Sequence, residues 1–179
     1  MRGLSRFILQ NLWGWKIEGS YPKEVKKFIT IAAPHTHWLD FPLGVLFRSV
    51  SGRDIKFLAK ASLFKGPFGW FFKWQGGFPI DRSKSSNKVD QIVEVFNKHE
   101  EFALALSPEG TRQKVNKWKT GFYFIAKGAQ VPIIMVAFDF TNKTLKVSKP
   151  YYTTEDENQD LKNIQAFYHG IEGKVKAFT

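Results

Sequence analysis

The sequence predicts an α/β fold, a single domain with a largely parallel or mixed central sheet flanked by helices. Strand-like apolar runs alternate along the chain with segments whose apolar residues recur at helical spacing. The runs Phe102 to Leu106 and Val131 to Phe140 are apolar enough for buried, central strands. The chain has 179 residues, of which 43% are hydrophobic, and this is enough for a single domain, residues 1–179, with one core.

The N-terminal residues predict an amphipathic helix with basic residues beside its apolar arc. The arc consists of Leu4, Phe7, Ile8 and Leu12. Such an arc serves either the core or a membrane surface. We therefore treat residues 1–20 as a possible membrane-contacting segment, with Phe7 and Ile8 as its contacts.

Further strands and a helix follow before the middle of the chain. Short apolar runs predict strands at Trp15 to Ile17, Phe28 to Ala33 and Ile55 to Ala59. Helical spacing predicts a helix from about Trp38 to Ser49. A further short strand is expected around Phe78 to Ile80.

An aromatic helix is expected between these last two strands, beginning at Pro67. On it, Phe68, Phe71 and Phe72 share one face, which is expected to enter the core. Trp70 and Trp74 lie on the other face, and lysines flank the helix. A helix that is aromatic on two sides suits the headgroup boundary of a membrane, so both tryptophans are candidate membrane contacts. The alternative is an ordinary buried helix.

The second half of the chain continues the alternation. A surface helix is predicted at Asn87 to Lys98, and a further helix, stopped by glycine, at Lys119 to Gly128. The segment Thr144 to Tyr151 should pair with the preceding strand across a turn at residues 141–143. A last helical stripe comprises Leu161, Ile164, Tyr168, Ile171 and Val175, interrupted at Gly170 and Gly173.

The amino-acid composition excludes disulfides and several kinds of metal site and membrane segment. The absence of cysteine excludes disulfides and thiolate zinc sites, and four scattered histidines give no metal-ligand spacing, so no metal is expected. No uncharged apolar run approaches the roughly 20 residues that span a bilayer. The N-terminus lacks the apolar segment and cleavage site of a signal peptide. These observations lead us to expect a cytoplasmic protein.

The formal net charge of +11 indicates an anionic partner. Nucleic acid, an anionic membrane face and an acidic carrier all meet that description. The aromatic residues cluster in an apolar helix and are not interleaved with basic residues along strands, which argues against a stacking platform for nucleic acid. We expect no nucleic-acid partner.

His35 and Asp40 directly follow the apolar run that ends at Ala33. A neutral imidazole is well matched to taking a proton at neutral pH, and a carboxylate on its far nitrogen fixes the tautomer. The pair therefore predicts activation of a hydroxyl group. Because the blocks at His35 and Glu109 each follow a predicted strand, both are expected to open onto one crevice.

Three further segments occur in a set order after this pair, at residues 76–82, 107–112 and 131–134. They read Gly-Gly-Phe-Pro-Ile-Asp-Arg, Ser-Pro-Glu-Gly-Thr-Arg and Val-Pro-Ile-Ile. Together the four blocks resemble those of the glycerolipid acyltransferase family, of the lysophosphatidic acid acyltransferase type. The resemblance covers roughly residues 28 to 138. It departs from the family at several positions, with His37 where serine is usual and Ser107 where phenylalanine is usual.

The resemblance implies transfer of a fatty acyl group from acyl-CoA or acyl carrier protein to a hydroxyl of a lysolipid such as 1-acyl-glycerol-3-phosphate. His35 would be the general base and Asp40 would orient it. Arg82 would bind the acceptor phosphate. The third block would supply further substrate contacts, namely Glu109, Gly110, Thr111 and Arg112. No cofactor beyond the acyl donor is implied.

Alternatives remain at three levels. Glu109 either bonds acceptor hydroxyls or braces its loop. The acceptor is either a phosphate-bearing lysolipid or a different, non-phosphate lipid. The whole chain is either this enzyme, peripheral on the inner face of an anionic membrane, or a basic membrane-binding module without catalysis.

Overall fold

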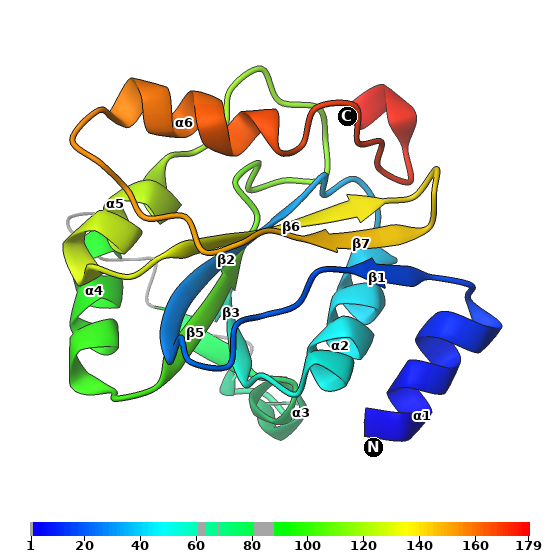
Figure 1. Cartoon of the computed structure of the whole chain (residues 1–179). Helices are drawn as coiled ribbons and strands as arrows, with labels where there is room; N and C mark the ends of the chain where they lie inside the picture. Colours follow the sequence, from blue (N-terminus) through cyan, green and yellow to red (C-terminus); the bar gives the residue numbers. More distant parts are fainter. Residues whose placement is uncertain (1, 61–63, 68, 81–87) are drawn as a thin grey trace.

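A computed structural model describes residues 2–60, 64–67, 69–80 and 88–179, with the backbone alone at 59, 60, 72, 79 and 80 (Figure 1). Helices and strands alternate along most of this chain, as the sequence predicts. The elements are α1 (Arg2–Arg6), the π-helical turn η1 (Phe7–Leu12), β1 (Lys16–Glu18), β2 (Lys27–Ala33), α2 (Asp40–Ser51), β3 (Ile55–Lys60), α3 (Gly69–Trp74), β4 (Gly77–Ile80), α4 (Lys88–Lys98), β5 (Phe102–Leu106), α5 (Gly121–Ala129), β6 (Ile133–Asp139), β7 (Thr144–Val147), α6 (Glu157–Ala166) and the 3-10 turn η3 (Lys176–Phe178).

The described strands form one mixed seven-stranded sheet in the order β1-β7-β6-β2-β5-β3-β4. The pairs β2 with β5, β2 with β6, β3 with β5 and β3 with β4 are parallel. The hairpin β6–β7 is antiparallel, and β1 runs parallel to β7 at the edge. The predicted fold class is therefore confirmed. The hairpin partner ends at Val147 and continues only as a single bridge between Ile133 and Tyr151.

Helices cover both faces of the sheet because its central strands bury side chains on each side (Figure 1). On β2, Ile29 and Ile31 pack into a core with α4, α5 and α6. Phe28, which points the other way, packs into a second core with η1 and α2. β6 is buried along its whole length, as expected of a central strand.

The N-terminal helix meets the core through a different residue from those of the predicted arc. Leu9 is fully buried, whereas Leu4, Phe7 and Leu12 are exposed. Ser5 also bonds Ser49 of α2, with 2.8 Å between the hydroxyl oxygens. Of the predicted membrane contacts here, Phe7 is exposed and Ile8 is half-buried. The arc that the pattern left open between core and membrane therefore faces mainly outward.

The last predicted helix is shorter than its apolar stripe. α6 ends at Ala166, and Gly170 has a left-handed φ of +75°, which breaks the helical path. Tyr168 and Ile171 are buried through the turn that follows. α6 is anchored by Asp160, whose buried carboxylate accepts hydrogen bonds from the hydroxyls of Tyr123 and Tyr151 at 3.0 and 2.7 Å.

The aromatic helix is only partly as predicted. Trp70 and Trp74 are exposed on α3, with 68% and 58% of their surface accessible. Phe71 is exposed as well, so its placement in the core was wrong. The helix has only six residues and lies beside the edge strand β4, where less of the fold covers it. Phe68 and the side chain of Phe72 lie outside the described part of the chain.

Candidate active site

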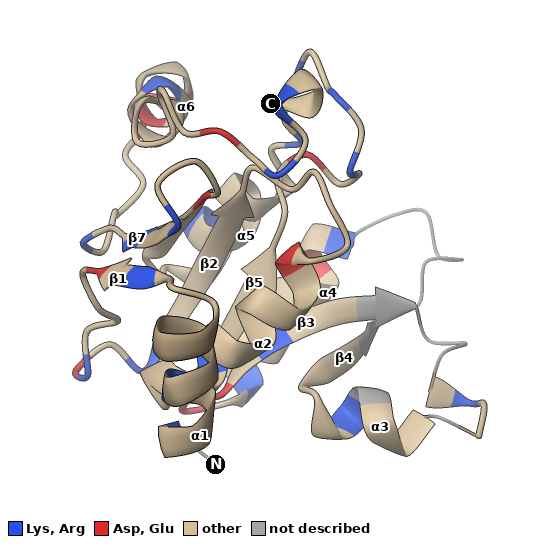
Figure 2. Cartoon of the chain, turned by 90° about the vertical axis from the view of Figure 1, so that its right-hand side faces the viewer, with Lys and Arg blue, Asp and Glu red and all other residues tan. Residues whose placement is uncertain are grey.

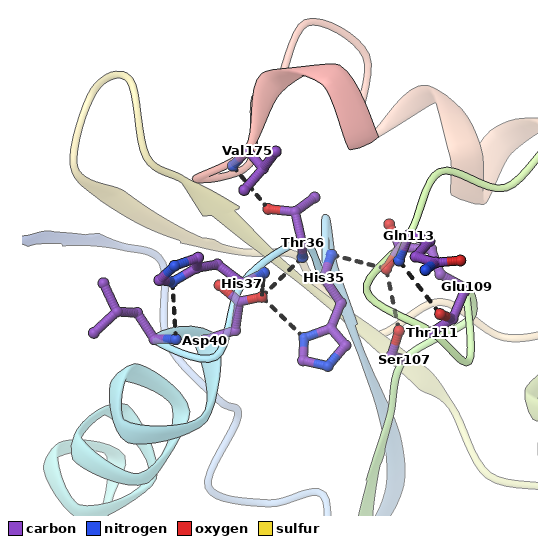
Figure 3. Close-up of polar contacts among 10 residues, drawn as sticks. His35, Thr36, His37, Asp40, Ser107, Glu109, Thr111, Gln113 and Val175 are labelled. Atoms are coloured by element: carbon purple, nitrogen blue, oxygen red, sulfur yellow. Dashed lines mark hydrogen bonds and ion pairs between the residues drawn. The ribbon is translucent and has the colours of Figure 1, made fainter.

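The polar residues of the first and third blocks meet at the carboxyl ends of β2 and β5, which are parallel neighbours. Parallel strands with helical connections bring their following loops to one edge of the sheet. Residues 34–39, here called the His35 loop, join β2 to α2. The loop after β5 carries Ser107 and Glu109 beside it (Figure 3). The expectation of one shared crevice is confirmed.

His35 and Asp40 form a direct pair, with 3.0 Å between Nδ1 of the imidazole and Oδ2 of the carboxylate (Figure 3). Asp40 is the first residue of α2 and is buried, while 27% of the His35 side chain is exposed. A carboxylate on Nδ1 holds the proton there and leaves Nε2 to accept another. The geometry is that of an oriented base.

The Asp40 carboxylate also organises the backbone around it. Its Oδ2 accepts hydrogen bonds from the amides of Thr36 and His37, each at 2.9 Å. These two backbone donors hold the carboxylate in place at the N-terminus of α2. The other oxygen, Oδ1, is buried and has no hydrogen-bond partner among the described residues.

Glu109 contacts the backbone of His35. Its Oε2 accepts the amide of His35 at 2.8 Å and the hydroxyl of Ser107 at 3.1 Å. Burial raises the pKa of Glu109 from its ordinary value, and the hydrogen bonds from His35 and Ser107 oppose that rise. Only 7% of the residue is exposed. This arrangement is that of a brace between the two loops.

His37 is held in a different way. Its Nδ1 accepts the amide of Leu39 at 3.2 Å, and its ring lies beside Trp38 with 5.6 Å between centroids. Asp40 contacts the amide of His37 but not its ring in the described structure. Its imidazole therefore lacks the carboxylate partner that His35 has.

A cavity of about 790 Å³ lies between α2 and the sheet, and His35 is among the residues that line it. Small side chains leave this space open, since Ala32, Gly44 and Ala105 line it. Gly110, Thr111 and Arg112 also line it, and all three are exposed. Arg82 lies outside the described residues. Among those that are described, no three His, Asp or Glu side chains are grouped as metal ligands.

The sequence pattern missed two features of this site. One is Thr36, which is 3% exposed and lies between Asp40 and Val175 (Figure 3). Val175 belongs to residues 171–179, here called the C-terminal segment. The other is the cavity. In the sequence, it is signalled only by small residues, such as Ala32 and Ala105, on the strand faces that point toward α2. Neither signal stands out in one sequence, because a buried threonine or alanine is usually part of an ordinary core.

A family model described as Acyltransferase matches residues 16–139. The chain is 32% identical over 148 residues to the 1-acyl-sn-glycerol-3-phosphate acyltransferase of Streptococcus pneumoniae, covering 77% of this chain and 52% of that protein. It is 32% identical over 145 residues to the protein of the same name from Saccharomyces cerevisiae, covering 76% and 46%. It thus spans about half the length of these curated relatives.

A solved structure supports the same fold. The crystal structure of the 1-acyl-sn-glycerophosphate (LPA) acyltransferase PlsC from Thermotoga maritima superposes with a TM-score of 0.66 at 20% identity. The superposition covers 93% of this chain and 74% of that chain. Because a family model matches the strands β1 to β6, the His35 loop and the Glu109 loop, this chain belongs to the acyltransferase family.

Proposed function

We propose that the chain is an O-acyltransferase domain that moves a fatty acyl group from a thioester to a hydroxyl of 1-acyl-glycerol-3-phosphate. The observation that carries the proposal is the 3.0 Å pair of His35 and Asp40 in the wall of a mainly apolar cavity. Curated relatives named for this activity support the choice of acceptor.

The proposed reaction uses one base in two steps. Nε2 of His35 takes the proton of the acceptor hydroxyl as its oxygen attacks the thioester carbonyl. The tetrahedral adduct then collapses, the carbon–sulfur bond breaks, and the thiolate takes the proton back from His35. Asp40 holds the ring and stabilises the transient imidazolium, as in other oriented bases. A thiol is a good leaving group, so the transfer needs no metal or redox cofactor.

The cavity suits the fatty acyl chain. It lies between α2 and the sheet, where Ala32, Val45 and Phe57 supply an apolar lining. Its volume of about 790 Å³ falls in the usual range for small-molecule pockets, roughly 300–1,000 Å³. An acyl chain bound there can place its thioester beside the proposed base, because His35 lines the same cavity.

The phosphate of the acceptor is assigned to the rim formed by the third block. Arg112 is exposed there, and a guanidinium can hold a phosphate through two parallel hydrogen bonds. Lys119 lies against Gly110, whose φ of +67° turns the loop at this point. Thr111 adds a hydroxyl. Arg82 keeps its proposed phosphate role from the second block. Glu109 is assigned as the brace of His35.

A membrane face completes the proposal. No helix within the described ranges is both long and apolar enough to cross a bilayer. Exposed Trp70, Trp74 and Phe7 offer apolar contacts, with Ile8 half-buried beside Phe7. Lys and Arg occur on many elements, including β1, α3 and the C-terminal segment (Figure 2). This charge would attract the cytoplasmic leaflet, and equally an acidic donor, acyl-CoA or acyl carrier protein.

The decisive experiment is an acyl-transfer assay that crosses both donors with lysophosphatidic acid, other lysophospholipids and a non-phosphate lipid alcohol, read by mass spectrometry. Transfer to lysophosphatidic acid above the others supports the proposal. Preference for the lipid alcohol would replace the proposed acceptor. Vesicle binding without any transfer would leave a membrane-binding module and overturn the enzymatic role.

A further inference from the structure

The His35 loop contacts a part of the chain outside the region that the family model matches, residues 16–139. This part is the C-terminal segment, residues 171–179. The amide of Val175 donates a hydrogen bond of 3.2 Å to Oγ1 of Thr36 (Figure 3). The amide of Thr36 in turn donates to Oδ2 of Asp40 at 2.9 Å. Thr36 thus connects the C-terminal segment to the carboxylate that orients His35.

Gly173 shows how closely the two segments approach. It is buried, and a Cβ added there would lie 2.5 Å from Oγ1 and 2.7 Å from Cγ2 of Thr36. Both distances are shorter than real Cβ contacts. The backbone of Gly173 is not in the left-handed region, so the need for glycine here is one of space.

The C-terminal segment is itself fixed to the sheet. The hydroxyl of Tyr168, just before the segment, donates to the carbonyl of Ile31 on β2 at 2.8 Å. The carbonyl of Glu172 accepts the amide of Phe140 at 3.0 Å, just after β6. The amide of Gly173 donates to Oγ1 of Thr179 at 3.0 Å. Thr36 therefore rests against an anchored surface and not against a loose tail.

We infer that the C-terminal segment positions the catalytic base through Thr36. Thr36 is a positioning residue: its hydroxyl is held by Val175, and its amide is thereby kept against Asp40. Gly173 acts with it by leaving room for its side chain. The inference rests on the proposed function only for its kinetic readout.

Two variants break the contact in different ways. Thr36→Val keeps the shape of the side chain and removes the oxygen that accepts the Val175 amide. Gly173→Ala keeps the oxygen and pushes against it. Thr36→Ser keeps the hydroxyl and is the conservative variant. Gly121→Ala is the matched control, because nothing lies within 4 Å of a Cβ at Gly121.

We expect Thr36→Val and Gly173→Ala each to lower kcat by about 10- to 100-fold, since small misplacements of a catalytic group have effects of this size. KM for donor and acceptor should stay unchanged, because neither residue is among the described residues that line the cavity at His35. Thr36→Ser and Gly121→Ala should keep the wild-type kcat. The double variant Thr36→Val with Gly173→Ala should be no worse than Gly173→Ala alone, because both changes break one contact.

A second readout does not depend on acyl transfer. The proton between Nδ1 of His35 and Asp40 is followed by NMR in the substrate-free protein. Its resonance should shift in Thr36→Val and Gly173→Ala and stay in place in Gly121→Ala. If the wild type transfers no acyl group, the proposed function fails while this resonance still decides the positioning role. An unchanged resonance, or wild-type kcat in folded Thr36→Val, overturns the inference.

Discussion

At the scale of single residues, hydrogen bonding separates two histidines that lie on the same loop. Nδ1 of His35 is occupied by the carboxylate of Asp40, and Nδ1 of His37 accepts the amide of Leu39. An imidazole with a carboxylate on one nitrogen is stabilised when the other nitrogen takes a proton. Of these two, His35 alone has that arrangement in the described structure, which supports the proposal that His35 is the base.

His35→Ala should therefore lower acyl transfer by at least about 100-fold, the usual contribution of a well-placed base. The fold should survive because the side chain is partly exposed. His37→Ala serves as the matched variant on the same loop and should cost far less. Initial rates with circular dichroism melting check both. Equal losses, or a loss at His37 alone, would contradict the assignment.

Arg82→Lys keeps a positive charge and loses the planar fork that binds phosphate through two bonds. The same change at Arg112 removes the fork at the rim of the cavity. Each should raise the KM for lysophosphatidic acid, with the KM for the acyl donor unchanged. Steady-state kinetics on both substrates give the answer. An acceptor KM unchanged in Arg82→Ala would show that this residue does not bind the phosphate.

Glu109→Gln tests the brace and carries a pH signature. The pKa of Glu109 is raised by burial, so the folded protein binds its proton more tightly than the unfolded chain does. The stability contributed by this group therefore decreases as pH rises from its ordinary value of 4.5 through the raised pKa. Glutamine has no such titration, and its amide oxygen can still accept the His35 amide.

The unfolding free energy of Glu109→Gln minus that of the wild type should thus increase with pH over that window. Urea unfolding at a series of pH values measures this difference. A difference independent of pH would refute the raised pKa of Glu109. Activity separates the two roles of Glu109. If Glu109 is a brace, Glu109→Gln leaves the acceptor KM unchanged. If Glu109 binds acceptor hydroxyls, the same substitution raises the acceptor KM.

At the scale of elements, α2 has two roles. Its first residue, Asp40, pairs with His35, and its inner face forms one wall of the cavity through Gly44, Val45 and Phe47. Gly44 faces Phe138 of β6, and a Cβ added at Gly44 would lie 3.8 Å from the edge of that ring. A glycine within a helix costs roughly 1 kcal/mol relative to alanine. The space it leaves is consistent with a pocket for an acyl chain.

Gly44→Leu should fill part of that space and shift donor preference toward shorter acyl chains. Gly44→Ala is its control, because a Cβ at this position meets Phe138 at an ordinary contact distance. The measurement is a competition among acyl donors of different length, with products read by mass spectrometry. An unchanged length profile in a folded Gly44→Leu protein would mean that the acyl chain binds elsewhere.

At the scale of the whole molecule, charge and exposed aromatic residues favour the same partner. The net charge is +11, and α3 presents exposed Trp70 and Trp74. Electrostatic attraction to anionic lipid decreases with salt, whereas insertion of apolar side chains does not. Vesicle binding should therefore have a salt-sensitive part and a salt-resistant part.

Replacing Trp70 and Trp74 together with serine should remove much of the salt-resistant binding without unfolding the protein, because both side chains are exposed. Tyr152→Ser is the control, since Tyr152 is also exposed but lies outside the helices. Co-sedimentation with phosphatidylglycerol vesicles at low and high salt, together with a melting curve, checks the prediction. Unchanged binding would place the contact elsewhere, with Phe7 as the next candidate to test.

The sequence by itself determined the fold class and the pairing of the two strongest blocks. Buried parallel strands must be apolar, and the residues that follow them must meet at one edge, so His35 and Glu109 could be brought together from the pattern alone. The spacing of His35 and Asp40 is local, since one loop and the first turn of a helix bring them into contact. Local periodicity also located most helices and strands within a few residues.

Only the tertiary structure decided which faces are covered and how the site is supported. Periodicity says that a helix has an apolar face but not what packs on it, so Leu9, and not the predicted arc, enters the core, and Phe71 stays exposed. The contact of Thr36 with Gly173 and Val175 joins residues far apart in sequence. Such contacts depend on how distant segments pack, and no spacing along the chain encodes them.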